Sequence, residues 1–263
     1  MLLILRKSYQ AGVFTWIIGL LIWQAAASVS NPDFLPGPYR TLQGALELSR
    51  DGSLFRYIGI SFLRVLTGWV LGSTIAIPLG IIMGRFKSVR AVTEPFLNFI
   101  RFIPPLAFIT LFMLWFGIGE KSKIMLILYS TLFIVLLNTM SGALAVEEDK
   151  VRSARSMGAS EWQILLHVIV PATVPYLFTG IRLAMGSSFM AIIGAEMVAA
   201  NSGVGFMIWN SRLYFKTDWI FVGLLSLGMM GFAADRALGF LGGLTLRRYG
   251  IAGKGRGGQG RGK

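Results

Sequence analysis

The sequence predicts an all-α membrane protein with about six transmembrane helices. Hydrophobic residues make up 54% of the 263 residues, charged residues make up only 14%, and the mean hydropathy is +0.66. A soluble domain usually carries about a quarter charged residues. Several long apolar runs also follow one another along the chain, and a segment that crosses lipid must be helical to satisfy its own backbone hydrogen bonds.

The first apolar run, residues 13–29, follows Arg6 and Lys7 and carries two tryptophans. We expect residues 1–30 to form an uncleaved first transmembrane helix, although the Ala-rich end of the run also fits a signal-peptidase site. Residues 31–54 are rich in Pro, Gly and polar residues. This composition predicts an exposed outer loop that contains a short amphipathic helix.

Residues 55–245 hold five further predicted spans, at about 55–84, 95–116, 123–145, 173–200 and 217–243. Pro104 and Pro105 interrupt one of them, and the loss of two backbone donors should bend that helix. Gly203 and Gly205 follow the span that ends near residue 200. They permit a sharp re-entrant turn on the outer side; an ordinary outer loop is the alternative.

Lysine and arginine are distributed unevenly between the predicted loops. If the N-terminus is cytoplasmic, the inner segments hold 14 of these residues and the outer segments hold seven. The inner set comprises Arg6, Lys7, Arg85, Lys87, Arg90, Lys150, Arg152, Arg155, Arg247, Arg248, Lys254, Arg256, Arg261 and Lys263. The positive-inside rule therefore predicts that both termini are cytoplasmic.

The C-terminal residues 246–263 are Gly-rich and cationic. Such a composition predicts a disordered tail, which either is simply solvated or touches anionic membrane lipid. The formal charge of +13 does not require a specific nucleic-acid partner, because membrane chains accumulate Lys and Arg on their cytoplasmic side.

Several functional classes lack the residues that they need. The chain has no cysteine and one histidine, His167, which argues against thiolate or His-clustered metal sites and against Ser-His-Asp catalysis. No G-x-x-x-x-G-K-[ST] loop is present for ATP hydrolysis, and no paired catalytic carboxylates support an intramembrane enzyme. We therefore expect a chain that is not an enzyme and that binds no metal or cofactor of its own.

Residues 151–169 are too polar to span a membrane and predict one amphipathic helix. Its apolar and small residues recur at spacings of three and four, which places them on one face. That face comprises Val151, Ala154, Gly158, Trp162, Leu165 and Ile169. Pro171 and Pro175 should end this helix and begin the next span. The helix either lies on the lipid headgroups or docks a soluble partner at its small residues.

The same stretch resembles a known family. The run Ala154–Ser160, followed by Val168-x-Val170-Pro171, is similar to the cytoplasmic loop signature of ABC-transporter permeases, the membrane subunits of binding-protein-dependent importers. The signature consists of an EAA triplet, a glycine and an aliphatic-x-aliphatic-Pro sequence. The triplet departs from it, because Arg152-Ser153-Ala154 stands in its place.

The resemblance extends over about residues 35–245 and is strongest to the nitrate, sulfonate, taurine and bicarbonate branch. It implies a type I ABC importer permease fold in a bacterial inner membrane, with residues 31–54 in the periplasm. The implied partners are ATP-binding subunits that hold ATP and Mg, a second permease copy, and a periplasmic or lipid-anchored solute-binding protein. It also implies that residues 151–169 include the coupling helix, with Ala154, Arg155, Gly158, Ala159, Ser160, Trp162 and Pro171 at the contact.

Ionisable residues at membrane depth are functional candidates because they are costly there. Arg182 and Glu196 lie 14 residues apart, about 21 Å along a helix, so each needs a partner elsewhere. The charges either pair across helices or, in the case of the arginines, line a cavity for an anionic substrate. The candidates for pathway or gate are Arg64, Arg101, Pro104, Pro105, Arg182, Glu196, Gly203 and Gly205, and Asp235 and Arg236 lie at similar depth.

A second functional class also fits these charges. An ion-coupled secondary transporter or channel would use Glu196 and Asp235 as coupling sites. It would transport without ATP, and it would leave the amphipathic segment at 151–169 without a role.

Overall fold

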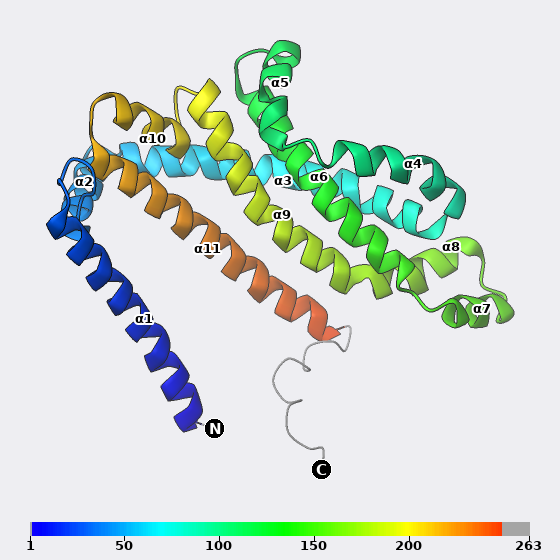
Figure 1. Cartoon of the computed structure of the whole chain (residues 1–263). Coiled ribbons are helices and arrows are strands. Elements are labelled where there is room, and N and C mark those ends of the chain that lie inside the picture. The colour runs from blue at the N-terminus through cyan, green and yellow to red at the C-terminus, as the bar shows by residue number, and fades with distance from the viewer. Residues whose placement is uncertain (1, 249–263) are drawn as a thin grey trace. The chain divides into compact units, whose positions relative to one another are not determined.

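The computed structural model describes the backbone of residues 2–248 and the side chains of residues 13–244, and it contains no β-strand in that range (Figure 1). The all-α prediction is therefore confirmed. Most of the predicted cationic tail, residues 249–263, lies outside the described residues. The elements are α1 (Leu2–Val29), α2 (Pro38–Arg50), α3 (Ser53–Arg85), α4 (Lys87–Ile100), a 3₁₀ turn (Pro105–Phe108), α5 (Ile109–Phe116), α6 (Glu120–Leu144), α7 (Glu148–Ser156), α8 (Glu161–Ile164), a π turn (Leu165–Ile169), α9 (Val170–Ala199), α10 (Val204–Leu213) and α11 (Thr217–Arg248).

Four helical stretches are long and apolar enough to cross a bilayer. They are α3, α6, the continuous stretch Glu161–Ala199 and residues 217–244 of α11. The pair α4 and α5 gives a fifth span if it is taken as one helix with a bend of 86°. The apolar part of α1, Val13–Val29, is shorter. Four or five of the six predicted spans therefore correspond to helices of sufficient length and hydropathy, and the first predicted span, residues 1–30, stays a prediction.

The described residues divide into two compact units, which are treated separately. The first contains residues up to Ile60 together with Asn201–Gly228. Within it, the Trp23 indole donates to the Pro36 carbonyl at 3.0 Å, and its ring stacks on Phe221 at 5.7 Å between centroids. Asp51, in the turn before α3, accepts bonds from the Ser53 hydroxyl and amide, and these bonds lower the pKa of its carboxyl group.

The second unit, Ser61–Ala200 with the chain from Met229 onward, contains the core that positions the candidate site. Helices α6 and α9 run side by side along it (Figure 1). Small residues of α3 recur at every fourth position where α3 meets α6: Gly68, Gly72, Ala76, Gly80 and Gly84. A Cβ atom at Gly72 would lie 2.9 Å from the Leu128 carbonyl oxygen. These residues therefore permit a close approach of the two backbones.

The predicted span at 95–116 differs from the sequence expectation. A helix begins earlier, at Lys87, and ends at Ile100, and the chain then turns by 86° into α5. Pro104 has no N–H to donate to the Ile100 carbonyl four residues earlier, so the helix cannot continue. The Ile103 amide and the Tyr129 hydroxyl of α6 donate to that carbonyl instead, at 2.9 and 3.0 Å.

Candidate functional site

The segment predicted as one helix over 151–169 is broken, which corrects the sequence expectation. Helix α7 ends at Ser156, and Gly158 takes a φ of +83°. The Gly158 amide donates to the Arg155 carbonyl and the Ala159 amide donates to the Ala154 carbonyl, at 3.0 and 3.1 Å. This pair of bonds is a Schellman C-cap, a motif that favours glycine because of its left-handed backbone. Gly158 is thus required by the turn rather than by a close-packed partner.

A new helix begins immediately after this turn. The Ser160 side chain accepts a bond from the Gln163 amide, and the Gln163 side chain accepts one from the Ser160 amide. This reciprocal arrangement is a capping box, which fixes the start of α8. Two helices joined by a tight turn therefore replace the single amphipathic helix.

The break also divides the predicted apolar face. Val151 and Ala154 of α7 and Ile169 of the π turn are buried, and they pack with Ile164 against Ile81 and Ala143. Trp162, by contrast, is 67% exposed. Met157, in the turn, is 81% exposed. The segment is thus attached to the core of its own unit on one side and presents large apolar side chains on the other.

Pro171 does not end the segment, contrary to the expectation. It lies in the first turn of α9, directly after the π turn, in which the Val170 amide donates to the Leu165 carbonyl five residues earlier instead of four. Pro175 does not end the segment either, because it lies inside α9. Helix α8 continues through the π turn into α9, so Glu161–Ala199 forms one helical stretch of 39 residues. Turns of the π type occur often at functional positions.

Glu161 joins the segment to the end of α3. Its carboxylate accepts a bond from Arg85 at 2.5 Å and also pairs with Arg155 of α7. Arg152, in the position of the missing acidic residue of the signature, forms a surface pair with Glu148 at 3.3 Å. The sequence singled out neither Glu148 nor Glu161.

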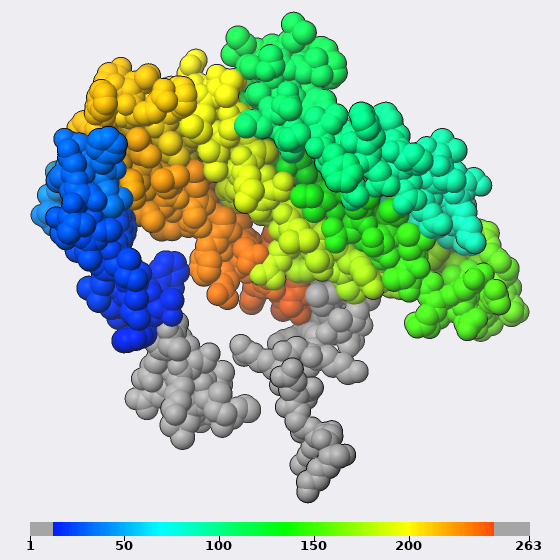
Figure 2. Space-filling view, in the orientation of Figure 1, coloured from blue at the N-terminus to red at the C-terminus, as the bar shows by residue number. Residues whose placement is uncertain are grey.

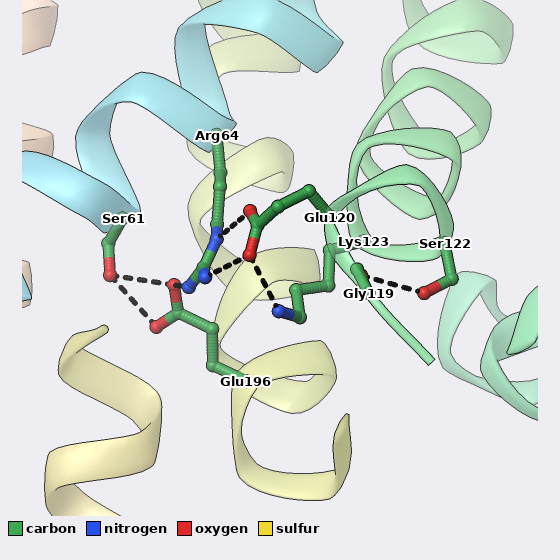
Figure 3. A network of polar contacts seen from close by, with 7 residues as sticks. All are labelled: Ser61, Arg64, Gly119, Glu120, Ser122, Lys123 and Glu196. Carbon is green, nitrogen blue, oxygen red and sulfur yellow. Dashed lines mark hydrogen bonds and ion pairs between the residues drawn. The ribbon is translucent and has the colours of Figure 1, made fainter. Parts of the chain in front are cut away.

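A network of polar side chains connects α3, α6 and α9 at the ends remote from the α7–α8 segment, and all its charged members except the exposed Glu120 are buried (Figure 3). Arg64 donates from Nη1 to Glu196 at 2.7 Å and from Nε and Nη2 to Glu120 at 2.6 and 2.5 Å. Ser61 lies 2.8 Å from both carboxylate oxygens of Glu196. Lys123 donates to Glu120 at 3.0 Å.

This network is electrically balanced among the residues drawn in Figure 3, since Arg64 and Lys123 face Glu120 and Glu196. Arg64 is only 4% exposed and Glu196 only 1% exposed. Burial of charges is tolerated when they are paired and hydrogen-bonded, as here. The structure therefore supports pairing across helices for these residues.

Arg182 is also paired, because it forms two bonds to Asp235 of α11. Arg182 and Glu196 each need a partner elsewhere by the sequence, and the structure provides it on another helix: Asp235 for Arg182 and Arg64 for Glu196. Arg101 is exposed and lies 5.0 Å from the centre of the Phe102 ring. Carboxylates thus neutralise two of the three arginines, so a cavity lined by three free cations is wrong for this structure. The two carboxylates proposed for ion coupling are engaged by the same pairs.

The glycines proposed at the outer turn differ from each other. Gly203 has a φ of +112°, which only glycine adopts readily, and it precedes α10 directly. Gly205 lies inside α10 and has no such backbone angle. Residues 204–213 form a helix that is too short to span a bilayer.

Sequence reasoning missed Ser61, Glu120, Lys123 and Tyr129. Glu120 and Lys123 were assigned to an outer loop and a span boundary, yet both lie in the first turn of α6. Their separation of three residues could have indicated a helical ion pair. Nothing in the spacing could have identified Arg64 as their partner, 56 residues from Glu120.

Comparison with known proteins gives a consistent result. Residues 76–243 match the family described as "Binding-protein-dependent transport system inner membrane component". A "Probable ABC transporter permease protein" of Brucella melitensis is 39% identical, over 78% of this chain and 83% of that protein. The taurine transport system permease protein of Escherichia coli is 31% identical, over 89% of this chain and 88% of that protein. The nitrate import permease protein of Synechocystis is 30% identical, over 86% of both chains.

A solved structure also resembles this chain. A chain of the MetNI methionine ABC transporter, in an inward-facing conformation, matches with a TM-score of 0.51 and 18% identity. The match covers 68% of this chain and 92% of the other. At this identity the comparison concerns the fold alone, and it agrees with the type I permease fold expected from the sequence.

Proposed function

This chain belongs to the family of binding-protein-dependent inner membrane transport components, and we propose that it is the membrane-spanning subunit of an ATP-driven importer for a small anionic solute. Members of this family are transport components rather than enzymes. The observation that carries the proposal is the α7–α8 segment, which packs on its own core and exposes Met157 and Trp162.

ATP-binding subunits are the partners that this exposed surface would contact. They would hold ATP and Mg, because this chain contains no phosphate-binding loop. The contact would involve Ala154, Arg155, Gly158, Ala159, Ser160 and Trp162, with Pro171 at the start of the following helix. A second copy of the chain and a periplasmic or lipid-anchored binding protein would complete the importer, in the bacterial inner membrane with both termini cytoplasmic.

The path of α8 and α9 supports a mechanical link. A displacement of α8 would pass along the continuous stretch from Glu161 to Glu196, about 52 Å of helical rise. Glu196 is bonded to Arg64 of α3 and, through Arg64, is connected to Glu120 of α6. Closure of the ATP-binding subunits would therefore bias the contacts at the far end of the three helices.

We also propose roles for the residues that the sequence offers as pathway or gate candidates. Pro104 and Pro105 lie at the 86° bend between α4 and α5, and Gly203 takes the positive φ directly before α10. Arg64 and Glu196 hold neighbouring helices together, and Arg182 does the same through Asp235. We assign these residues to gating or support of the pathway. Arg101 remains an exposed cation, and Gly205 is a buried residue of α10.

The proposed substrate class rests on relatives rather than on the arginines. Relatives are named for taurine, aliphatic sulfonates and nitrate, which carry an anionic sulfonate or are anions themselves. Because Arg64 and Arg182 are neutralised, they give no independent support for an anion. Nitrate, a sulfonate such as taurine, or bicarbonate remains our proposed cargo, delivered by the binding protein.

Binding of the ATP-binding subunit tests the proposal most simply. We expect Trp162→Ala to reduce co-purification of the ATP-binding subunit by roughly tenfold or more, because a buried interface tryptophan commonly contributes over 2 kcal/mol. Trp16→Ala provides a matched control, since Trp16 on α1 is 76% exposed. Equal co-purification of both variants and the unmodified chain would exclude α8 as the docking surface.

A further inference from the structure

A cationic site lies beside the α7–α8 segment, and of its cations only Arg155 also belongs to the docking surface proposed above. It is a pocket of about 250 Å³ between the end of α3, the start of α4, the end of α6 and α7. Five cationic side chains line it: Arg85, Lys87, Arg90, Arg152 and Arg155. Figure 2 shows the teal surface of α4 and the light green surface of α7 and α8 at the same end of this unit.

The cations outnumber the carboxylates that face them. Glu161 pairs with both Arg85 and Arg155, and Glu148 pairs with Arg152. Glu94 lies 3.9 Å from Arg90, at the limit of an ion pair. The described residues provide no ion pair for Lys87. Three carboxylates therefore pair with or lie near five cations, which leaves an excess of two positive charges around the pocket.

Glu148 and Gly84 also line the pocket, and the remaining lining residues are apolar. Ala143, Leu144 and Val146 come from the end of α6 and the residues after it, and Val151 and Ile169 complete the wall. A pocket lined by both cations and hydrocarbon suits an amphiphile better than a free inorganic ion. Its place at the ends of two apolar spans is also where lipid headgroups would meet the protein.

Helix α4 is amphipathic, as expected for a helix at the membrane interface. Lys87 and Arg90 lie on the face that lines the pocket. Val92, Phe96 and Phe99 lie on the opposite face and are 79%, 63% and 71% exposed. A short helix with a cationic face and an exposed aromatic face is typical of the membrane interface.

We propose that this pocket binds a phosphate group, and that the phosphate belongs to an anionic phospholipid of the adjacent leaflet. The phosphate would lie among Lys87, Arg90 and Arg152, while the acyl chains would lie against the apolar ends of α3 and α6. Arginine suits this role because its guanidinium presents forked donors to phosphate oxygens. The site would anchor the junction of α3 and α4, and with it the α7–α8 segment, which Glu161 links to Arg85 at the end of α3.

The test measures lipid binding by the purified full chain in detergent. Native mass spectrometry would titrate the chain with phosphatidylglycerol, with phosphatidylcholine and with inorganic phosphate. We expect Lys87→Gln with Arg90→Gln to weaken phosphatidylglycerol binding at least about tenfold, since each surface cation contributes about a kilocalorie per mole. This double variant keeps the Arg85–Glu161–Arg155 bridge, so the segment should stay folded.

Arg56→Gln with Lys121→Gln is the control, because it removes the same charge from two exposed residues outside the pocket. Preferential loss in the pocket variant would support the proposal. An equal loss of phosphatidylglycerol binding in both variants would overturn the proposal, because it would show attraction to net charge alone. Binding of phosphatidylcholine as tight as that of phosphatidylglycerol would also overturn it, because it would show nonspecific lipid binding. Competition by millimolar inorganic phosphate would identify a free-phosphate site instead, and loss of the lipid on addition of the ATP-binding subunit would assign the pocket to that subunit.

Discussion

Gly158 allows the turn between α7 and α8 through a single backbone angle. Its φ of +83° lies in the left-handed region, and no atom lies within 4 Å of where a Cβ would stand. The requirement for glycine is therefore conformational and not steric. A bulky substitution here would disturb the turn whether or not a partner binds, so Trp162 is the sharper probe of docking.

Gly158→Ala should loosen this turn. An L-residue in the left-handed region costs about 1–2 kcal/mol, so the amides of residues 154–160 should exchange with deuterium roughly tenfold faster. Gly158→Asn should have a smaller effect, because asparagine tolerates this conformation. Hydrogen exchange by mass spectrometry measures both, and identical exchange in the two variants and the unmodified chain would contradict the C-cap.

Replacement of Arg64 should lower the free energy of unfolding more than any other single substitution proposed for this chain. Arg64→Gln removes the cation from a carboxylate that is 1% exposed, and breaking such a buried pair costs about 3–5 kcal/mol. Arg64→Gln with Glu196→Gln should recover much of this loss, because the second change removes the buried charge. Denaturant unfolding of the purified chain would compare the variants; additive losses in the double variant would argue against direct coupling of the pair.

At the scale of the helices, the contact between α3 and α6 depends on small residues at every fourth position. Gly72→Ala would place a Cβ 2.8 Å from that of Thr131 and 2.9 Å from a backbone oxygen that cannot rotate away. We expect a loss of about 1–3 kcal/mol in unfolding free energy. Gly186→Ala, in open space on α9, should instead be neutral or stabilise by up to about 1 kcal/mol through helix propensity. Effects of the same sign at both positions would refute the close contact.

The bend between α4 and α5 has its own support from α6. Tyr129→Phe deletes the hydroxyl that bonds to the Ile100 carbonyl and keeps the ring, which packs 4.5 Å from Phe108. The expected loss is about 1 kcal/mol, the net contribution of one hydrogen bond. Tyr176→Phe is the control, since Tyr176 is 44% exposed on α9. Thermal unfolding should therefore separate the two variants, and equal midpoints would show that the bend does not need the hydroxyl.

The sequence predicted the elements better than their junctions. Long apolar runs identified α3, α6, α9 and α11 because hydropathy acts over a whole span. Apolar periodicity does not predict the turn at Gly158, because the apolar spacing continues across it; the signal for the turn is the capping-box pattern of Ser160 and Gln163. The ion pairs resisted prediction for a different reason: partners such as Arg64 and Glu196 are 132 residues apart and meet only through helix packing.

At the scale of the whole molecule, these features describe a membrane transport component whose sequence contains no ATP-binding loop. One end of the 39-residue stretch Glu161–Ala199 exposes Trp162, and the other end holds Glu196 in the balanced network. Both intramembrane carboxylates named for ion coupling are paired with arginines. This arrangement favours energy input at the α7–α8 segment over coupling to an ion gradient.

Solute uptake into proteoliposomes distinguishes these two energy sources directly. The chain would be reconstituted with its ATP-binding subunit and binding protein, and uptake of taurine, an alkanesulfonate, nitrate and bicarbonate would be followed with and without ATP. We predict uptake of one of these solutes that requires ATP and all three proteins and is lost in Trp162→Ala but retained in Trp16→Ala. Uptake by this chain alone, driven by a proton or sodium gradient without ATP, would contradict the proposed function.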